Sequence, residues 1–132
     1  MATYNKFNAW AENMPEGANL GTDQFVIALS NTAPVATNSV LADITQISYT
    51  NLSSRNVTTT SASQTGGTFT LVLADLVMTA SGAVGPFRYV VLFDDTVAGD
   101  PLVGWWDYGS SITMANGETF TVDFTGAAIT LS

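Results

Sequence analysis

The chain contains no cysteine and no histidine among its 132 residues. The lack of Cys excludes disulfides, a thiolate nucleophile and Cys-based zinc or iron–sulfur sites. The lack of His removes the commonest general base, the commonest metal ligand and every Ser-His or Cys-His catalytic pair. Carboxylates are the candidate catalytic groups that remain. The sequence therefore predicts a protein that is not an enzyme and that carries no cofactor.

Positive charge is also scarce. Lys6, Arg55 and Arg88 are the only cations, against 11 acidic residues, which gives a net charge of −8. Proteins bind nucleic acids by neutralising phosphates with Lys and Arg, so we expect no nucleic-acid partner. We also expect no membrane partner, because an anionic surface would repel the chain and no apolar run approaches the roughly 20 residues of a membrane span. The first residues do not have the pattern of a secretory signal peptide.

The residues that are present favour strands. Hydrophobic residues make up 46% of the chain, charged residues make up only 11%, and Thr is frequent. Thr is enriched in strands. Short alternating segments separated by turn signals predict an antiparallel two-sheet sandwich over residues 20–132, jelly-roll or immunoglobulin-like, within a single domain 1–132. Long helical connections, which would favour a parallel sheet, are missing from the pattern.

The strongest strand signals lie at 25–29, which is apolar on both faces, and at 86–94, which alternates and is the best candidate for a central strand. Tight turns are predicted at 64–67 and 116–117, where Gly follows a polar residue or another Gly. A final strand is predicted at 128–131 after a turn at Gly126. The predicted core is Phe25, Ile27, Leu29, Phe69, Leu71, Phe87, Tyr89, Val91, Phe93, Phe120, Val122 and Phe124.

Residues 1–16 carry the only strong helical pattern. Tyr4, Phe7, Trp10 and Met14 recur at helical spacing, and Pro15 predicts the end of the helix at Met14. This aromatic stripe either packs on its own domain or docks on another subunit. We expect docking, because a short terminal helix is marginal in water and needs a surface on which to fold. The double substitution of Phe7 and Trp10 by Ala should then leave the sandwich folded but impair assembly.

Two adjacent tryptophans, Trp105 and Trp106, form the most unusual stretch. Neighbouring side chains of a strand face opposite ways, so both can be buried, one on each covered face. Alternatively one of them is exposed and contacts a protein partner or a sugar ring. The predicted partner-binding residues are thus Tyr4, Phe7, Trp10, Met14 and Trp105.

Charged residues suggest two further contacts. Arg88 is the sole cation in an apolar strand, so we expect it to pair with a carboxylate, for example a buried Asp107 or Asp123, or to stack on an aromatic ring. Asp94, Asp95 and Asp100 bracket one loop and Asp107 follows it. Such carboxylates outline a glycosidase site or a calcium loop, but the order of residues 95–100 is not that of an EF-hand. We interpret them as solvated loop residues, and we predict no metal.

Four segments resemble small virion proteins of tailed bacteriophages. They are Val-Ile-Ala-Leu-Ser-Asn-Thr-Ala-Pro at 26–34, Gly-Pro-Phe-Arg-Tyr-Val-Val-Leu-Phe-Asp-Asp at 85–95, Asp-Pro-Leu-Val-Gly-Trp-Trp-Asp-Tyr-Gly at 100–109 and Asn-Gly-Glu-Thr-Phe-Thr-Val-Asp-Phe at 116–124. The resemblance covers residues 20–132. Such proteins are described as capsid decoration (cement) proteins or as tail-fibre proteins.

This resemblance implies a non-enzymatic β-sandwich in a virion that assembles in the bacterial cytoplasm. We expect a decoration protein, because the chain has no heptads or shaft repeats of a fibre. Its expected partners are the major capsid protein or other virion subunits, and further copies of itself. The alternative is a tail-fibre protein or a receptor- or carbohydrate-binding module of the tail.

Overall fold

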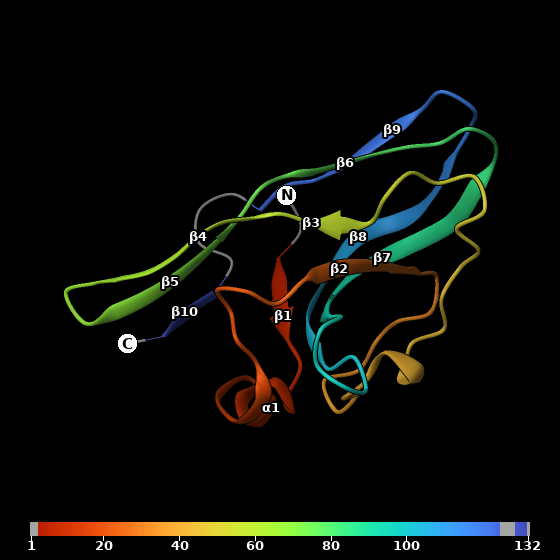
Figure 1. The fold of residues 1–132 in the computed structure, drawn as a ribbon. Helices are drawn as coiled ribbons and strands as arrows, with labels where there is room; N and C mark the ends of the chain where they lie inside the picture. The colour runs from red at the N-terminus through yellow and green to blue at the C-terminus, as the bar shows by residue number, and fades with distance from the viewer. Residues whose placement is uncertain (1–2, 125–128, 132) are drawn as a thin grey trace.

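The computed structural model describes residues 3–124 and the backbone of 129–131. Strands dominate, with one short α-helix and one 3-10 turn in the described part of the chain (Figure 1). In chain order the elements are β1 (Tyr4–Lys6), α1 (Trp10–Gly17), β2 (Phe25–Ser30), η1 (Leu41–Asp43), β3 (Asn56–Val57), β4 (Thr59–Thr65), β5 (Thr68–Leu73), β6 (Leu76–Thr79), β7 (Val84–Asp94), β8 (Leu102–Met114), β9 (Thr119–Val122) and β10 (Ile129–Leu131).

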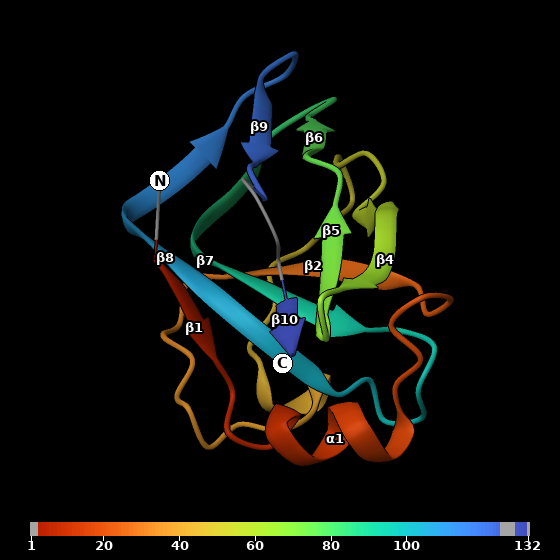
Figure 2. The same cartoon turned by 90° about the vertical axis from the view of Figure 1, so that its left-hand side faces the viewer.

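The strands form a five-stranded sheet in the order β1-β8-β7-β2-β3, a three-stranded sheet β10-β5-β4 and a two-stranded sheet β6-β9. Every strand pair is antiparallel. The two smaller sheets lie over one face of the large sheet, and α1 lies across one end (Figure 2). The predicted all-β sandwich-like fold is therefore confirmed.

β2 shows that the large sheet is covered on both faces. All six of its residues are buried, as the apolar pattern at 25–29 predicts. Alternate side chains enter two separate clusters, with Phe25 and Ile27 in the larger one and Val26 and Ala28 in the smaller one. The larger cluster fills the space beneath the smaller sheets. The smaller cluster is closed by Phe7 and by residues around η1.

β7 is a central strand between β8 and β2, as predicted, but the predicted faces of its side chains are partly wrong. The ladder with β8 shifts register between Phe87 and Tyr89. This irregularity places Phe87 in the same cluster as Val90, whereas Val91 joins the opposite cluster. Tyr89, which we expected in the core, is only partly buried. A bulge of this kind reverses the alternation that follows it.

Most of the other predicted core residues pack as expected. Phe69 and Phe120 are partly buried against the larger cluster, and Phe124 is buried. The turn at 64–67 is confirmed, because Gly66 and Gly67 adopt φ values of 59° and 87° between β4 and β5. β10 pairs with β5 close to the predicted final strand. The predicted turn at Gly126 lies outside the described residues.

The prediction of one helix over residues 1–16 is wrong. Tyr4–Lys6 form β1 instead, and Tyr4 pairs with Trp106 in β8. Gly104 makes this approach possible, because a Cβ there would overlap the Tyr4 ring and lie 2.7 Å from the Asn5 carbonyl oxygen. The helix α1 begins only at Trp10 and continues past Pro15, since the Ala18 N–H closes its last turn on the Met14 carbonyl at 3.3 Å.

Candidate functional site

The predicted docking stripe belongs to the core of its own domain. Phe7 is fully buried and Trp10 is 2% exposed. The Phe7 ring lies 4.6 Å from the Trp105 ring, centroid to centroid, and the Phe7 N–H donates to the Val103 carbonyl at 3.1 Å. Neither side chain can reach a partner in this fold. Packing on its own domain, the other alternative that the sequence left open, is what the structure shows.

The remaining predicted partner-binding residues are only partly exposed. The Tyr4 ring packs on Trp106 at 5.4 Å, and burial raises the pKa of its hydroxyl to about 12. Met14 packs against the larger cluster and borders an open pocket of about 380 Å³. Trp106 is buried in the larger cluster, whereas Trp105 packs on the smaller one and is partly exposed. The two tryptophan side chains thus lie on opposite faces of the large sheet.

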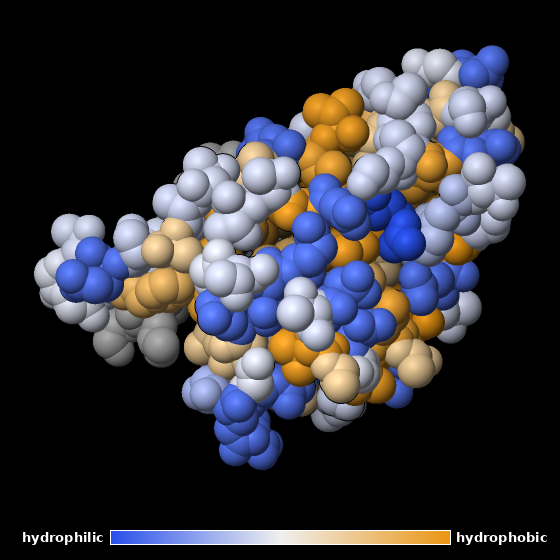
Figure 3. Space-filling model, viewed as in Figure 1, coloured by the Kyte–Doolittle hydropathy of each residue, from blue (hydrophilic) through white to orange (hydrophobic). Residues whose placement is uncertain are grey.

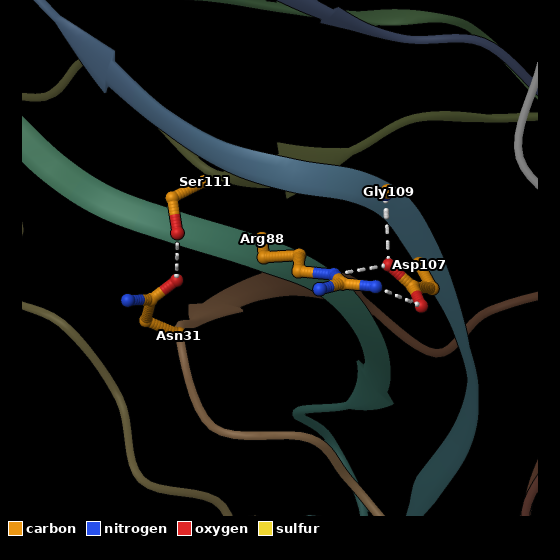
Figure 4. A network of polar contacts seen from close by, with 5 residues as sticks. All are labelled: Asn31, Arg88, Asp107, Gly109 and Ser111. Carbon is orange, nitrogen blue, oxygen red and sulfur yellow. Dashed lines mark hydrogen bonds and ion pairs between the residues drawn. The ribbon is translucent and has the colours of Figure 1, made fainter.

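Arg88 and Asp107 form a two-point ion pair on the surface of the large sheet (Figure 4). Arg88 Nε donates to Asp107 Oδ1 at 2.7 Å and Nη2 donates to Oδ2 at 3.1 Å. The Gly109 N–H also donates to Oδ1, at 2.8 Å. These hydrogen bonds, that from Arg88 first, hold the pKa of Asp107 below its usual range. The predicted partner Asp107 is confirmed, but the prediction that it is buried is wrong, because the pair lies exposed on the sheet surface.

We expect Asp107→Asn to leave both the melting temperature and any glycan-degrading assay close to those of the unmodified chain. The ion pair is exposed, and water screens such pairs strongly. Its carboxylate already accepts hydrogen bonds from the Arg88 guanidinium and the Gly109 N–H. Thermal unfolding and a polysaccharide hydrolysis assay check this. Glycan cleavage by the purified chain, abolished by the substitution, would show that Asp107 is catalytic.

One end of the molecule gathers α1 and several loops, whose carboxylates are exposed or, at Asp100, partly exposed. The β7–β8 loop meets the 19–24 turn, where the Gln24 N–H donates to Thr96 Oγ1 at 2.8 Å, and it meets η1, where the Leu41 N–H donates to the Asp100 carbonyl at 3.0 Å. α1 lies at the same end (Figure 1). We call this surface the acidic end, defined by Glu12, Glu16, Asp43, Asp95 and Asp100. It is the candidate functional site that the fold leaves accessible.

Beneath the acidic end lies a buried carboxyl pair that sequence reasoning missed. Asp94 is fully buried, so its interpretation as a solvated loop residue is wrong, and its Oδ1 accepts the Thr96 N–H at 3.0 Å. Within the described residues no N–H or hydroxyl donates to its Oδ2. Asp23 is 8% exposed, and its Oδ2 accepts the Asn19 N–H at 3.0 Å.

These surroundings make Asp94 a group that titrates near neutrality. Burial, and then the side-chain hydrogen bond with the Asp23 carboxyl, raise the pKa of Asp94 to about 7. A hydrogen bond between two carboxyls requires a proton on one of them.

The two chemical alternatives for the acidic loop find no matching geometry. Among the described residues, no three acidic side chains gather closely enough to hold a metal ion. Asp107 lies opposite Tyr89 in the ladder and pairs with Arg88, whereas Asp94 ends β7 and contacts Asp23. The loop and Asp107 therefore do not form one carboxylate site.

No protein-family model matches the chain, and neither a curated protein nor a solved structure matches it. In the described part of the chain, none of the helices has the length and apolar character needed to cross a bilayer.

Proposed function

We propose that the chain is a non-enzymatic structural protein of a tailed-bacteriophage virion, and specifically a capsid decoration protein that binds the outer shell and stabilises it. One observation carries the proposal beyond the resemblance itself. Three of the four resembling segments, 26–34, 85–95 and 100–109, cover most of β2, most of β7 and the first part of β8, which are neighbours in the large sheet. Segments far apart in the sequence thus make up one packed unit, as expected if the whole framework is shared.

The acidic end supplies the attachment surface in this proposal. The aromatic residues Phe7 and Trp10 near the N-terminus are buried in the core, so in this proposal exposed loops make the contact with the shell. Carboxylates on several loops suit a basic patch on the major capsid protein, because complementary charge speeds and orients association. Bound there, the protein would bridge neighbouring capsomers against the outward pressure of packaged DNA.

The tail-fibre or carbohydrate-binding alternative depends on an exposed tryptophan. Trp105 is partly exposed, which favours that alternative, but its ring packs on Phe7 at 4.6 Å. An aromatic ring that stacks on a sugar needs one free face. We therefore rank this alternative second, and glycan-array binding that Trp105→Ala removes would support it.

We expect the purified chain to co-sediment with phage shells that lack it, and to do so less at high salt than at low salt. Salt screens exposed charges over about 10 Å at 0.1 M. The double substitution Glu16→Gln with Asp95→Asn should weaken binding. The matched control, Asp107→Asn with Glu118→Gln, removes the same charge elsewhere and should bind as the unmodified chain does. Failure to bind shells at any salt concentration would contradict the proposed function.

A further inference from the structure

β4 is an edge strand that lacks the charged residues and proline that commonly prevent pairing with another chain. It lies at the outer side of the three-stranded sheet, next to β5 alone. Edge strands are commonly blunted by charged side chains or proline. From Asn56 to Ala74 the sequence has neither, although the whole chain carries a net charge of −8. This edge is therefore a neutral surface on a strongly acidic protein.

The hairpin of β4 and β5 projects from the body of the molecule, so this edge is accessible (Figure 1). Its tip is the Gly66-Gly67 turn, where an added Cβ would meet nothing within 4 Å. The residues of β4 are exposed except for Thr59 and Ala62, which are partly buried. Residues near the middle of the hydropathy scale cover most of the projecting part (Figure 3). Burial of apolar side chains alone would therefore not make this part bind a partner.

The register of the hairpin shows which backbone groups of β4 point outward. Thr65 and Thr68 flank a two-residue turn and form a hydrogen-bonded pair. Bonded and non-bonded pairs alternate along an antiparallel ladder, so the backbone groups of Ser63 face Thr70 in β5. Those of Ala62 and Gln64 consequently face away from β5. An irregularity between Thr59 and Ser61 marks the inner limit of this free edge.

We propose that β4 pairs antiparallel with β4 of a second copy of the chain, centred on Ser63. Ala62 then lies opposite Gln64 of the second copy, and the reverse, which forms about four backbone hydrogen bonds. The two Ser63 residues face each other as a non-bonded pair, with their Cα atoms about 4.5 Å apart.

The charge distribution favours a second copy as the occupant. A two-fold pair brings the same patch of each molecule together, so a charged residue close to the two-fold axis would meet its own like charge. The segment from Asn56 to Ala74 avoids this repulsion, whereas other surfaces of two chains of charge −8 would repel. This pairing does not depend on attachment to a shell.

A cysteine scan tests the geometry directly, because the chain has no native cysteine. The expected spacing of about 4.5 Å at Ser63 lies within the range of disulfide-linked Cα atoms. Under mild oxidation, Ser63→Cys should yield a covalent dimer. Thr45→Cys, at an exposed loop position, should remain largely monomeric under the same conditions. Equal cross-linking of the two variants would overturn the proposed register.

A charge substitution tests the association without a cross-link. Ser63→Lys lowers the overall repulsion by changing the net charge from −8 to −7, but it sets two like charges opposite each other. In sedimentation velocity the unmodified chain should dimerise reversibly, and this variant should dimerise about twofold to fivefold more weakly. Thr45→Lys, with the same net charge, should dimerise as the unmodified chain does, and the thermal melts of the three should coincide. A monomer at every concentration up to about 1 mM, or a dimer that Ser63→Lys leaves unchanged, would overturn the proposal.

Discussion

Asp94→Asn should raise the stability of the protein at about pH 8 and remove a loss of stability between about pH 4 and pH 7. The asparagine keeps the acceptor for the Thr96 N–H, which lies 3.0 Å from Asp94 Oδ1. Its amide group can also donate a hydrogen bond toward the neighbouring Asp23 side chain. The substitution therefore keeps the contacts and removes the charge.

The direction of this pH dependence of stability follows from the raised pKa of Asp94. Asp94 has a pKa of about 7 in the folded chain against an ordinary value of 3.8. A carboxyl of this kind favours folding fully below its unfolded pKa, and the benefit is lost as the pH rises through the folded value. This difference corresponds to at most about 4 kcal/mol. The protein should consequently be more stable at about pH 4 than at about pH 8 with respect to this group.

Chemical denaturation at several pH values measures the effect. Asp95→Asn is the matched control, since it removes one negative charge from the exposed neighbouring residue. The control should retain the fall in the free energy of unfolding between about pH 4 and pH 7, whereas Asp94→Asn should not. The same fall in Asp94→Asn would mean that another group is responsible.

The second large effect concerns the residues that the sequence assigned to docking. Phe7→Ala with Trp10→Ala should unfold the protein or lower its melting temperature severely. Both side chains are buried, and large-to-small changes of this kind cost about 3–5 kcal/mol each. A domain of this size has a total stability of about 5–15 kcal/mol. The structure thus reverses the expectation, drawn from the sequence, that this variant stays folded.

Circular dichroism and thermal unfolding of the purified double variant test this directly. Val77→Ala is a suitable control, because Val77 is a large hydrophobic residue that is 55% exposed. Its removal should change the melting temperature little. Near-native melting of the double variant would show that the N-terminal segment is not part of the core.

Local patterns predicted the central strands and the turns because these depend on neighbouring residues. β2 is apolar on both faces and is buried on both, and the two glycines at 66–67 supply the left-handed backbone that a two-residue turn requires. The outcome at these positions needs little information from distant parts of the chain. The same is true of the turn at 116–117, where Gly117 has a φ of 86°.

The N-terminal segment was mispredicted because its large apolar residues fit a helical spacing although part of the segment forms a strand. Tyr4, Phe7, Trp10 and Met14 fit a helical stripe, but strand pairing with β8 decides the conformation of Tyr4–Lys6. That pairing depends on the open space at Gly104, which lies about 100 residues away in the sequence. A local pattern contains no sign of it.

The carboxyl pair escaped prediction for a similar reason. Asp23 precedes β2 and Asp94 ends β7, so they meet only because Phe25 pairs with Asp94 in the antiparallel ladder. Knowing that β2 and β7 are neighbours would have placed the two carboxyls side by side. Their separation along the chain otherwise conceals the contact.

The copy number of the chain in purified virions tests the proposed function most directly. Quantitative mass spectrometry would compare this chain with the major capsid protein in intact particles, in isolated heads and in isolated tails. A decoration protein should be present at hundreds of copies in a fixed ratio to the major capsid protein, and it should stay with the heads. A few copies confined to the tails, or none in the particle, would contradict the proposal.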